Sequence, residues 1–123
     1  MLICFYPSFS LHSSYLAHSY FHLYRLTGDE QYREWAWELA QAINRRCQTE
    51  NGGFSSLKNS DSVPSEMIDY QPANLLSNTF KYLYLIFTDQ SVLPADKWIF
   101  NQRGNPMPIC GTNERYPKQM CER

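Results

Sequence analysis

The feature that most constrains the fold is a chain reversal at Gly28 and Asp29, which separates two stretches with helical periodicity. Gly28 is the residue type that most easily adopts the left-handed conformation that closes a helix. Asp29 can accept a hydrogen bond from the first N–H groups of a following helix, and the acidic Glu30 suits the positive end of the helix dipole. The segment therefore predicts the turn of a helical hairpin.

Apolar spacing predicts how far the two helices extend. We expect a first helix from about Ser13 to Thr27 and a second from about Glu30 to Cys47. The apolar stripe of the first helix consists of Leu16, Tyr20, Leu23 and Thr27. The stripe of the second consists of Tyr32, Trp35, Ala36, Leu39 and Ile43. Stripes of this width need a partner surface, and we expect Trp35 to lie in the core.

Polar and aromatic side chains on these helices carry weaker signals. Glu30, Glu34 and Glu38 lie opposite the apolar stripe, and we interpret them as a solvated face rather than a catalytic carboxylate pair. His18 and His22 are one turn apart, but no carboxylate or cysteine at suitable spacing completes a metal site. Trp37 lies on another face, where both packing and stacking on a sugar stay open.

The rest of the chain predicts a short strand, a third helix and a second strand. Phe54–Leu57 follows a glycine turn and alternates like a strand, and a polar loop extends to about Tyr70. A third helix is expected over Ala73–Thr88, after Pro72. Its expected buried side consists of Leu76, Phe80, Leu83 and Phe87, broadened by Leu75, Thr79 and Ile86. Trp98–Phe100 is typical of a strand, followed by a turn with Gly104 and Pro106.

Composition fits one domain or a piece of a larger one, because the chain has 123 residues and 43% of them are hydrophobic. The formal net charge is -1, without a basic block that would attract nucleic acid. No stretch approaches the ~20 apolar residues of a transmembrane helix. The start of the sequence lacks a basic leader and is interrupted by Pro7, so it predicts no convincing signal peptide.

The four cysteines are Cys4, Cys47, Cys110 and Cys121, and they include no Cys-x-x-Cys pair. This spacing argues against a zinc ribbon or a thioredoxin-type site. Two disulfides in three pairings are open. We expect Cys47 to be a buried free thiol, because it extends a helical apolar face, and Cys110 with Cys121 to be the more plausible bridge.

Four segments, in this order and spacing, resemble the C-terminal part of glycoside hydrolase family 47. They are Leu23–Asp29 with Tyr32–Trp35, Gly52–Leu57, Thr79–Phe87 and Leu93–Ile109. The family comprises the class I α-1,2-mannosidases, which trim mannose from N-linked glycans in the ER and Golgi. The resemblance implies an all-α fold, a partial (α/α)7 barrel with a short β-hairpin. It divides the chain into a divergent segment 1–18, a barrel fragment 19–109 and a polar, loosely ordered tail 110–123.

The same resemblance implies that the catalytic acids are missing. The family inverts the anomeric centre with carboxylates that protonate the leaving oxygen and activate water. The Glu of its Arg-Pro-Glu-Thr motif corresponds to Tyr15, a further acid to His18, and two pocket acids to Pro72 and Asn78. The remaining carboxylates correspond to positions before Met1. A phenol is a poor base at neutral pH, so we expect no catalytic residue here.

The calcium motif is changed as well. The family ligand is the Thr of a Phe-Asn-Thr-Glu motif, and its place is taken by Gln102 in Phe100–Arg103. The Gln102 amide and a backbone carbonyl could still bind calcium, but Arg103 puts a positive charge beside them. We therefore expect that calcium is not retained.

These observations support a catalytically inactive fragment that resembles mannosyl-oligosaccharide α-1,2-mannosidases. Complete homologues trim α-1,2-linked mannose from high-mannose N-glycans by calcium-dependent inverting hydrolysis. The alternatives are a non-enzymatic module that binds glycan or associates with a full-length mannosidase, and a partial gene product. The resemblance implies the secretory pathway as the compartment.

Overall fold

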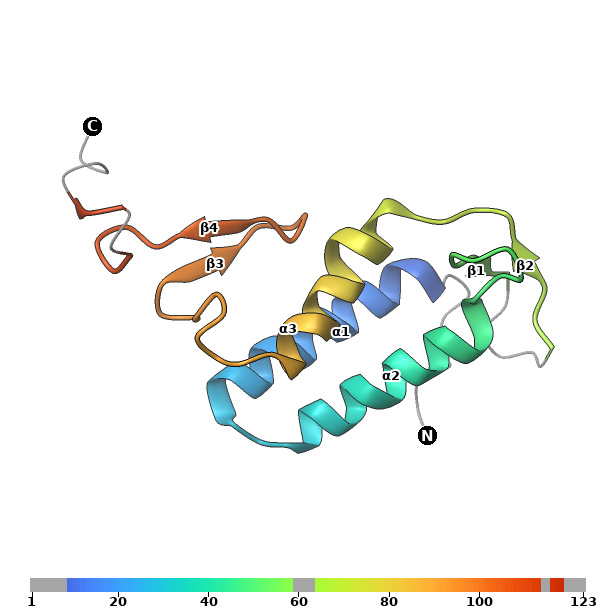
Figure 1. Ribbon diagram of the computed structural model, residues 1–123, viewed down its shortest axis with the longest axis horizontal. Coiled ribbons are helices and arrows are strands. Elements are labelled where there is room, and N and C mark those ends of the chain that lie inside the picture. The colour runs from blue at the N-terminus through green and yellow to red at the C-terminus, as the bar shows by residue number, and fades with distance from the viewer. Residues whose placement is uncertain (1–8, 59–63, 114–115, 119–123) are drawn as a thin grey trace. The chain divides into compact units, whose positions relative to one another are not determined.

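The computed structural model describes residues 9–58, 64–113 and 116–118 (Figure 1). The chain divides into two compact units, Met1–Phe87 and Thr88–Arg123, which we treat separately. Within the described ranges, no helix combines the length and the apolar character needed to cross a membrane.

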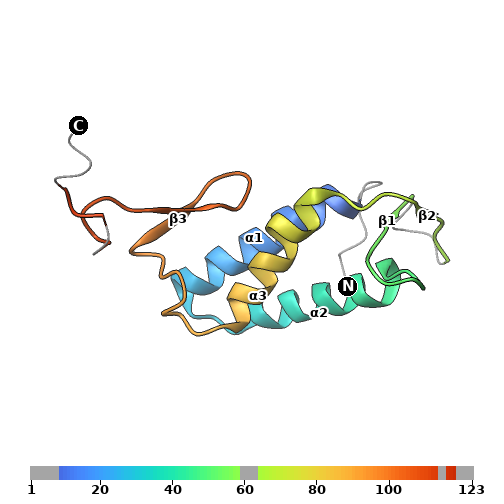
Figure 2. The same ribbon diagram turned by 45° about the horizontal axis from the view of Figure 1, so that its top comes forward.

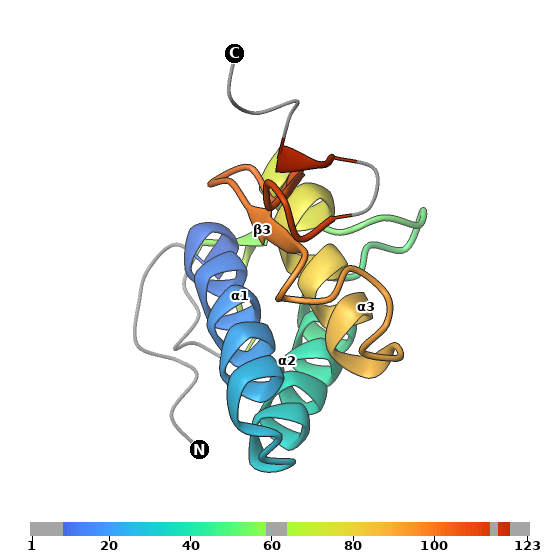
Figure 3. The ribbon, with the colours of Figure 1, turned by 90° about the vertical axis from the view of Figure 1, so that its left-hand side faces the viewer.

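The first unit contains the expected helical hairpin and a third helical segment. Helix α1 covers Phe9–Thr27, α2 covers Gln31–Cys47, and a π-helix η1, Leu75–Phe80, continues into α3, Lys81–Phe87. Helix α1 thus begins four residues before the predicted Ser13. Helices α1 and η1–α3 run in the same direction and α2 runs against them (Figures 1 and 2). Viewed from one end, the three axes form a triangle around the core (Figure 3).

The turn between α1 and α2 has the predicted chemistry. Gly28 adopts a φ of 71°, and its N–H donates to the Tyr24 carbonyl at 2.8 Å. The Asp29 carboxylate accepts a hydrogen bond from the Gln31 N–H at 3.0 Å, which caps the start of α2. The Thr27 hydroxyl accepts from the Asp29 N–H at 3.2 Å. Side chains on both sides of the reversal therefore fix its geometry.

The core lies where α1, α2 and η1–α3 meet. Helix α2 buries Ala36, Leu39, Ile43 and Cys47, which confirms the predicted stripe apart from its two aromatic members. The other buried residues of these helices are Ser14, Ala17 and Phe21 on α1, and Leu75, Thr79, Tyr82, Leu83, Leu85 and Ile86 on η1–α3. Cys47 is free, as predicted, and burial raises the pKa of its thiol to about 11, so it is protonated at neutral pH.

Several predicted core positions were wrong. Trp35 is 38% exposed because its indole lies at the outer edge of the contact between α1 and α2. On α1 the buried face is rotated away from the predicted stripe, leaving Leu23 and Thr27 exposed. Leu76 and Phe87 on the third helix are also exposed, and Tyr82 packs against Phe21 of α1. The predicted burial of Leu83, and of Leu75, Thr79 and Ile86 beside it, is confirmed.

The third helix differs from the prediction in its first half. Residues Leu75–Phe80 form a π-helix, whose turn is wider than that of the predicted α-helix. Pro72 precedes it, and the Pro72 carbonyl accepts from the Leu75 N–H at 3.1 Å. The helix then ends at Phe87, one residue before the predicted Thr88.

A short antiparallel pair follows α2. Strand β1, Ser56–Leu57, pairs with β2, Met67–Ile68, in the register Ser56↔Ile68 and Leu57↔Met67. The predicted strand was therefore too long, since Phe54 forms only an isolated bridge with Gln48. The predicted polar loop to Tyr70 was wrong at β2, which is paired through its backbone although both of its side chains are exposed.

The second unit contains another antiparallel pair. Strand β3, Trp98–Phe100, confirms the predicted strand and pairs with β4, Pro106–Pro108. Pro106 thus lies in a strand and not in the predicted turn. Backbone hydrogen bonds join Asn101 to Asn105 at one end of the pair and Ile109 to Lys97 at the other. In this register the N–H and C=O groups of the odd-numbered residues of β4 point toward β3, and those of the even-numbered residues point away from it. The two prolines occupy the even positions, where a missing N–H removes no bond between the strands.

The described part of the tail, residues 110–113 and 116–118, contains one buried residue and a turn. Asn113 is buried, and its carbonyl accepts from the Tyr116 N–H at 2.9 Å. Cys110 is disulfide-bonded. The predicted disulfide partner, Cys121, lies outside the described residues, so this pairing stays a prediction. Cys4 and Pro7 also lie outside the described residues.

Candidate functional site

The positions that the resemblance assigns to the family acids gather at one end of the first unit. Tyr15 lies in the first half of α1 and His18 at its middle, Pro72 lies three residues before η1 begins, and Asn78 lies within η1. Helices α1 and η1 pack together and start at the same end (Figure 1). Tyr15 is 63% exposed, whereas Pro72 is buried. These positions carry a phenol, an imidazole and an amide, and none of these groups is a carboxylate.

Aromatic rings that include His18 connect α1 to α3. The His18 ring lies 4.5 Å from that of His22 and 4.7 Å from that of Tyr82. Phe21 packs on Tyr82 with ring centroids 5.4 Å apart. Burial raises the pKa of Tyr82 to about 12, so its hydroxyl stays protonated. In the described part of the chain no group of three or more His, Cys, Asp or Glu side chains could hold a metal. His18 and His22 are partly buried among these rings.

This pair of histidines should make stability depend on pH. Burial lowers the pKa of His18 below 6.5, and burial together with the His18 charge lowers that of His22. As the pH falls through 6.5 the unfolded chain takes up protons first, so the free energy of unfolding falls until both folded histidines are also protonated. We expect a lower urea midpoint at about pH 5 than at about pH 8. The control is the variant His18→Gln/His22→Gln, which should lose part of this dependence; an unchanged pH profile would contradict the assignment.

The position of the family calcium ligand lies at the tip of the β3–β4 hairpin. Gln102 and Arg103 are exposed there, next to Asn101. The Asn101 side-chain oxygen already accepts from the N–H groups of Arg103 at 2.9 Å and Asn105 at 3.0 Å. Calcium prefers about six to eight oxygen ligands, including carboxylates, and this tip offers amides beside a guanidinium. These residues do not fit a calcium ion.

Two features of α2 were not predicted from the sequence. The Arg33 guanidinium lies 5.4 Å from the Tyr24 ring centroid and 5.5 Å from that of Phe87. Because Tyr24 belongs to α1 and Phe87 to α3, this one side chain of α2 contacts both neighbouring helices. Arg33 also forms an ion pair with Glu30 at 3.1 Å. The other feature is the exposed Trp35, flanked by Tyr20 and Tyr32. The 3.6-residue period assigns faces to one helix, but it does not show which rings of separate helices meet.

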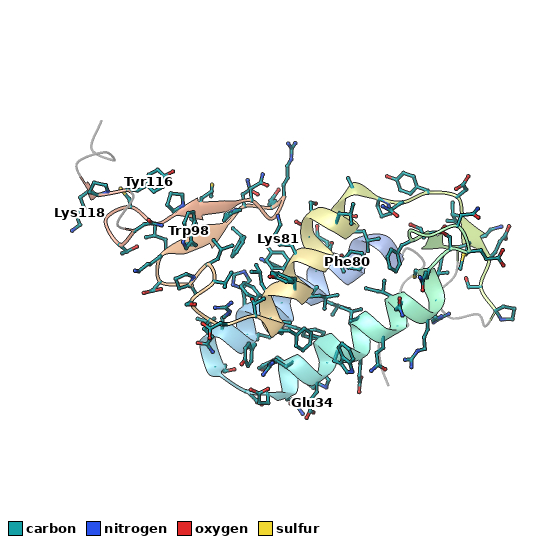
Figure 4. All side chains as sticks on the ribbon, viewed as in Figure 1. Glu34, Phe80, Lys81, Trp98, Tyr116 and Lys118 are labelled. Atoms are coloured by element: carbon teal, nitrogen blue, oxygen red, sulfur yellow. The ribbon has the colours of Figure 1, made fainter. Side chains whose placement is uncertain are left out.

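The glutamates predicted to form a solvated face are exposed. Figure 4 shows Glu34 on the outer side of α2, pointing away from the other helices. The interpretation of this face as solvent-exposed is therefore confirmed.

Residues 16–109 match glycosyl hydrolase family 47. Over 98 residues the chain is 45% identical to mannosyl-oligosaccharide alpha-1,2-mannosidase IA of Drosophila melanogaster, covering 80% of this chain and 14% of that protein. It is 43% identical to human mannosyl-oligosaccharide 1,2-alpha-mannosidase IB over 91 residues, 74% of this chain and 14% of that protein. A third relative, human endoplasmic reticulum mannosyl-oligosaccharide 1,2-alpha-mannosidase, is 40% identical over 93 residues, 74% of this chain and 13% of that protein.

The chain therefore spans about one seventh of the length of these relatives, 14% for the first of them. The match covers most of the helical hairpin, η1–α3 and both short strand pairs, and it includes Gln102, whereas Tyr15 lies one residue before it. Since a single family accounts for residues 16–109, this chain belongs to glycosyl hydrolase family 47.

Proposed function

We propose that this chain is a catalytically inactive segment of the α-1,2-mannosidase fold. Its complete relatives are named for mannosyl-oligosaccharides, and we propose the same substrate class, high-mannose N-glycans, as the ancestral ligand. The single observation that supports the proposal is the chemistry of the residues that the resemblance assigns to the family acid positions on α1 and around η1, which are Tyr15, His18, Pro72 and Asn78. Inverting hydrolysis needs one acid and one base, and these side chains supply neither carboxylate.

The proposal extends to calcium and compartment. We propose that calcium binding is lost, which is supported by the amides and the guanidinium at the hairpin tip around Gln102. We also propose the secretory pathway, ER or Golgi, as the compartment, because one relative carries the endoplasmic reticulum in its name. The division into segments 1–18, 19–109 and 110–123 is part of the same proposal, supported by the match over residues 16–109.

A mannose-release assay tests the loss of activity. The purified chain should release no mannose above a blank from a high-mannose oligosaccharide, with added calcium or with a chelator. The Drosophila relative serves as the positive control. Mannose release that depends on calcium would overturn the proposal, and the Tyr15→Glu variant should stay inactive because three other acid positions remain changed.

Exposed apolar side chains favour one second candidate, association with the remainder of a family 47 barrel. Leu26 is 78% exposed, Tyr84 67% and Leu76 59%. A single helical hairpin with one further helix cannot cover such residues by itself, and larger apolar patches mark protein contacts. Co-purification with a mannosidase lacking the matching segment would support this candidate, and a stable monomer in its presence would count against it.

A further inference from the structure

Trp35 lies on the surface of α2 with aromatic rings on two sides. Its centroid is 5.8 Å from that of Tyr20 on α1, at an interplanar angle of 50°, and 5.6 Å from that of Tyr32, at 80°. Neither ring is stacked face to face on the indole, and the residue remains 38% exposed. The indole is thus held by its neighbours while part of it stays accessible to solvent.

Tyr20 and Glu38 add hydrogen-bonding groups to the helices that carry this indole. Glu38 lies one turn further along α2 and is exposed like Trp35. Burial, and then the charge of Glu38, raise the pKa of Tyr20. Among the described residues neither the Trp35 N–H nor the Glu38 carboxylate has a hydrogen-bond partner. The surface therefore offers an apolar ring, an acceptor and two donors within a small area.

We propose that Trp35, Tyr20 and Glu38 form a surface site for one neutral pyranose ring. The C–H groups of a sugar ring carry partial positive charge and suit the negative face of an indole. Neighbouring sugar hydroxyls would donate to Glu38 and accept from the Tyr20 hydroxyl. The exposed carboxylates of Glu34 and Glu38 disfavour anionic sugars and phosphates.

This site includes none of the positions assigned to the family acids, although Tyr20 lies two residues after His18 on α1. It needs no catalytic carboxylate. Only the choice of a mannoside as the first probe rests on the proposed function. Trp37 provides a comparison on the same helix, since it is 57% exposed and, among the described residues, has a ring contact with Phe87 alone, at an interplanar angle of 84°.

The indole N–H signals of Trp35, Trp37 and Trp98 in an NMR spectrum of the nitrogen-labelled full chain test the proposal. Titration with methyl α-mannoside should shift the Trp35 signal in a saturable manner, with half-saturation in the millimolar range, and leave the other two unchanged. Glu38→Gln should weaken binding roughly tenfold, because it removes a hydrogen bond to a charged group. Glu34→Gln is the matched control on the same helix and should keep the affinity within about twofold.

Each remaining outcome decides between named alternatives. Equal shifts at all three indoles, or equal effects of Glu38→Gln and Glu34→Gln, would overturn the site. A uronic acid that binds as well as the neutral mannoside would overturn the charge argument and the proposal with it. A Trp35 signal that moves with protein concentration alone would assign this surface to a second copy. If methyl α-glucoside shifts Trp35 and the mannoside does not, the site stands and the mannose assignment of the proposed function fails.

Discussion

Leu39→Ala is expected to lower the free energy of unfolding by about 2–5 kcal/mol. Leu39 has no exposed surface and lies on the face of α2 that meets α1 and α3. The substitution removes buried apolar atoms and leaves a cavity that Ala36 and Ile43, its neighbours on the same face, cannot fill without moving α2. A chain of this size has little stability in reserve, so we expect the variant to be largely unfolded at room temperature.

The control for this experiment is Leu26→Ala, the same chemical change at a residue that is 78% exposed. It should change the free energy of unfolding by no more than about 0.5 kcal/mol. Urea denaturation followed by circular dichroism measures both variants. If the two substitutions cost the same, the helices do not share the core described above. A stabilising effect of Leu26→Ala would instead indicate that its exposed side chain drives self-association.

Arg33→Ala is expected to lower the free energy of unfolding by about 1–2 kcal/mol, the second largest effect. The guanidinium lies against the rings of Tyr24 and Phe87 and pairs with Glu30. The ion pair with Glu30 contributes little, because the Glu30 side chain is 64% exposed. Most of the expected loss therefore comes from the two ring contacts, which connect α2 to both of its neighbours.

Two further variants separate the ring contacts from the charge. Arg33→Lys keeps the charge but removes the planar group that lies against the rings, so it should be nearly as destabilising as Arg33→Ala. Arg45→Ala removes an exposed arginine from the last turn of the same helix and should cost at most about 0.5 kcal/mol. Full stability of Arg33→Lys would show that charge, and not ring contact, stabilises the junction of the three helices.

Local chemistry in the sequence predicted the parts of the fold that depend on few residues. The Gly28–Asp29 reversal, the α2 stripe and β3 each follow from the backbone preference or spacing of neighbouring residues. Strand β2 was not predicted, because two residues are too few to show an alternating pattern. The π-helix was predicted as part of an α-helix, because the apolar residues of this segment also fit an α-helical period.

The errors in the core have a different cause. Periodicity identifies a face of a helix but does not show how wide the covered part of it is. Trp35 and Ala36 are adjacent in sequence, yet only Ala36 is fully buried, because the small residue lets the helices approach each other. The changed positions of the candidate site could be named from the sequence, because a family resemblance assigns them one by one. The Trp35 surface could not, because it depends on Tyr20 of another helix. Contacts between helices are a property of packing that a single-helix pattern does not contain.

The prolines of β4 have a consequence for the behaviour of the isolated chain. A two-stranded sheet exposes two open edges, and an open edge can pair with a strand of another molecule and begin an aggregate. Pro106 and Pro108 occupy the β4 positions that face away from β3, so the outer edge lacks the two N–H groups that a further strand would need. This edge is closed to strand addition, and replacing both prolines by valine would open it to fibril growth.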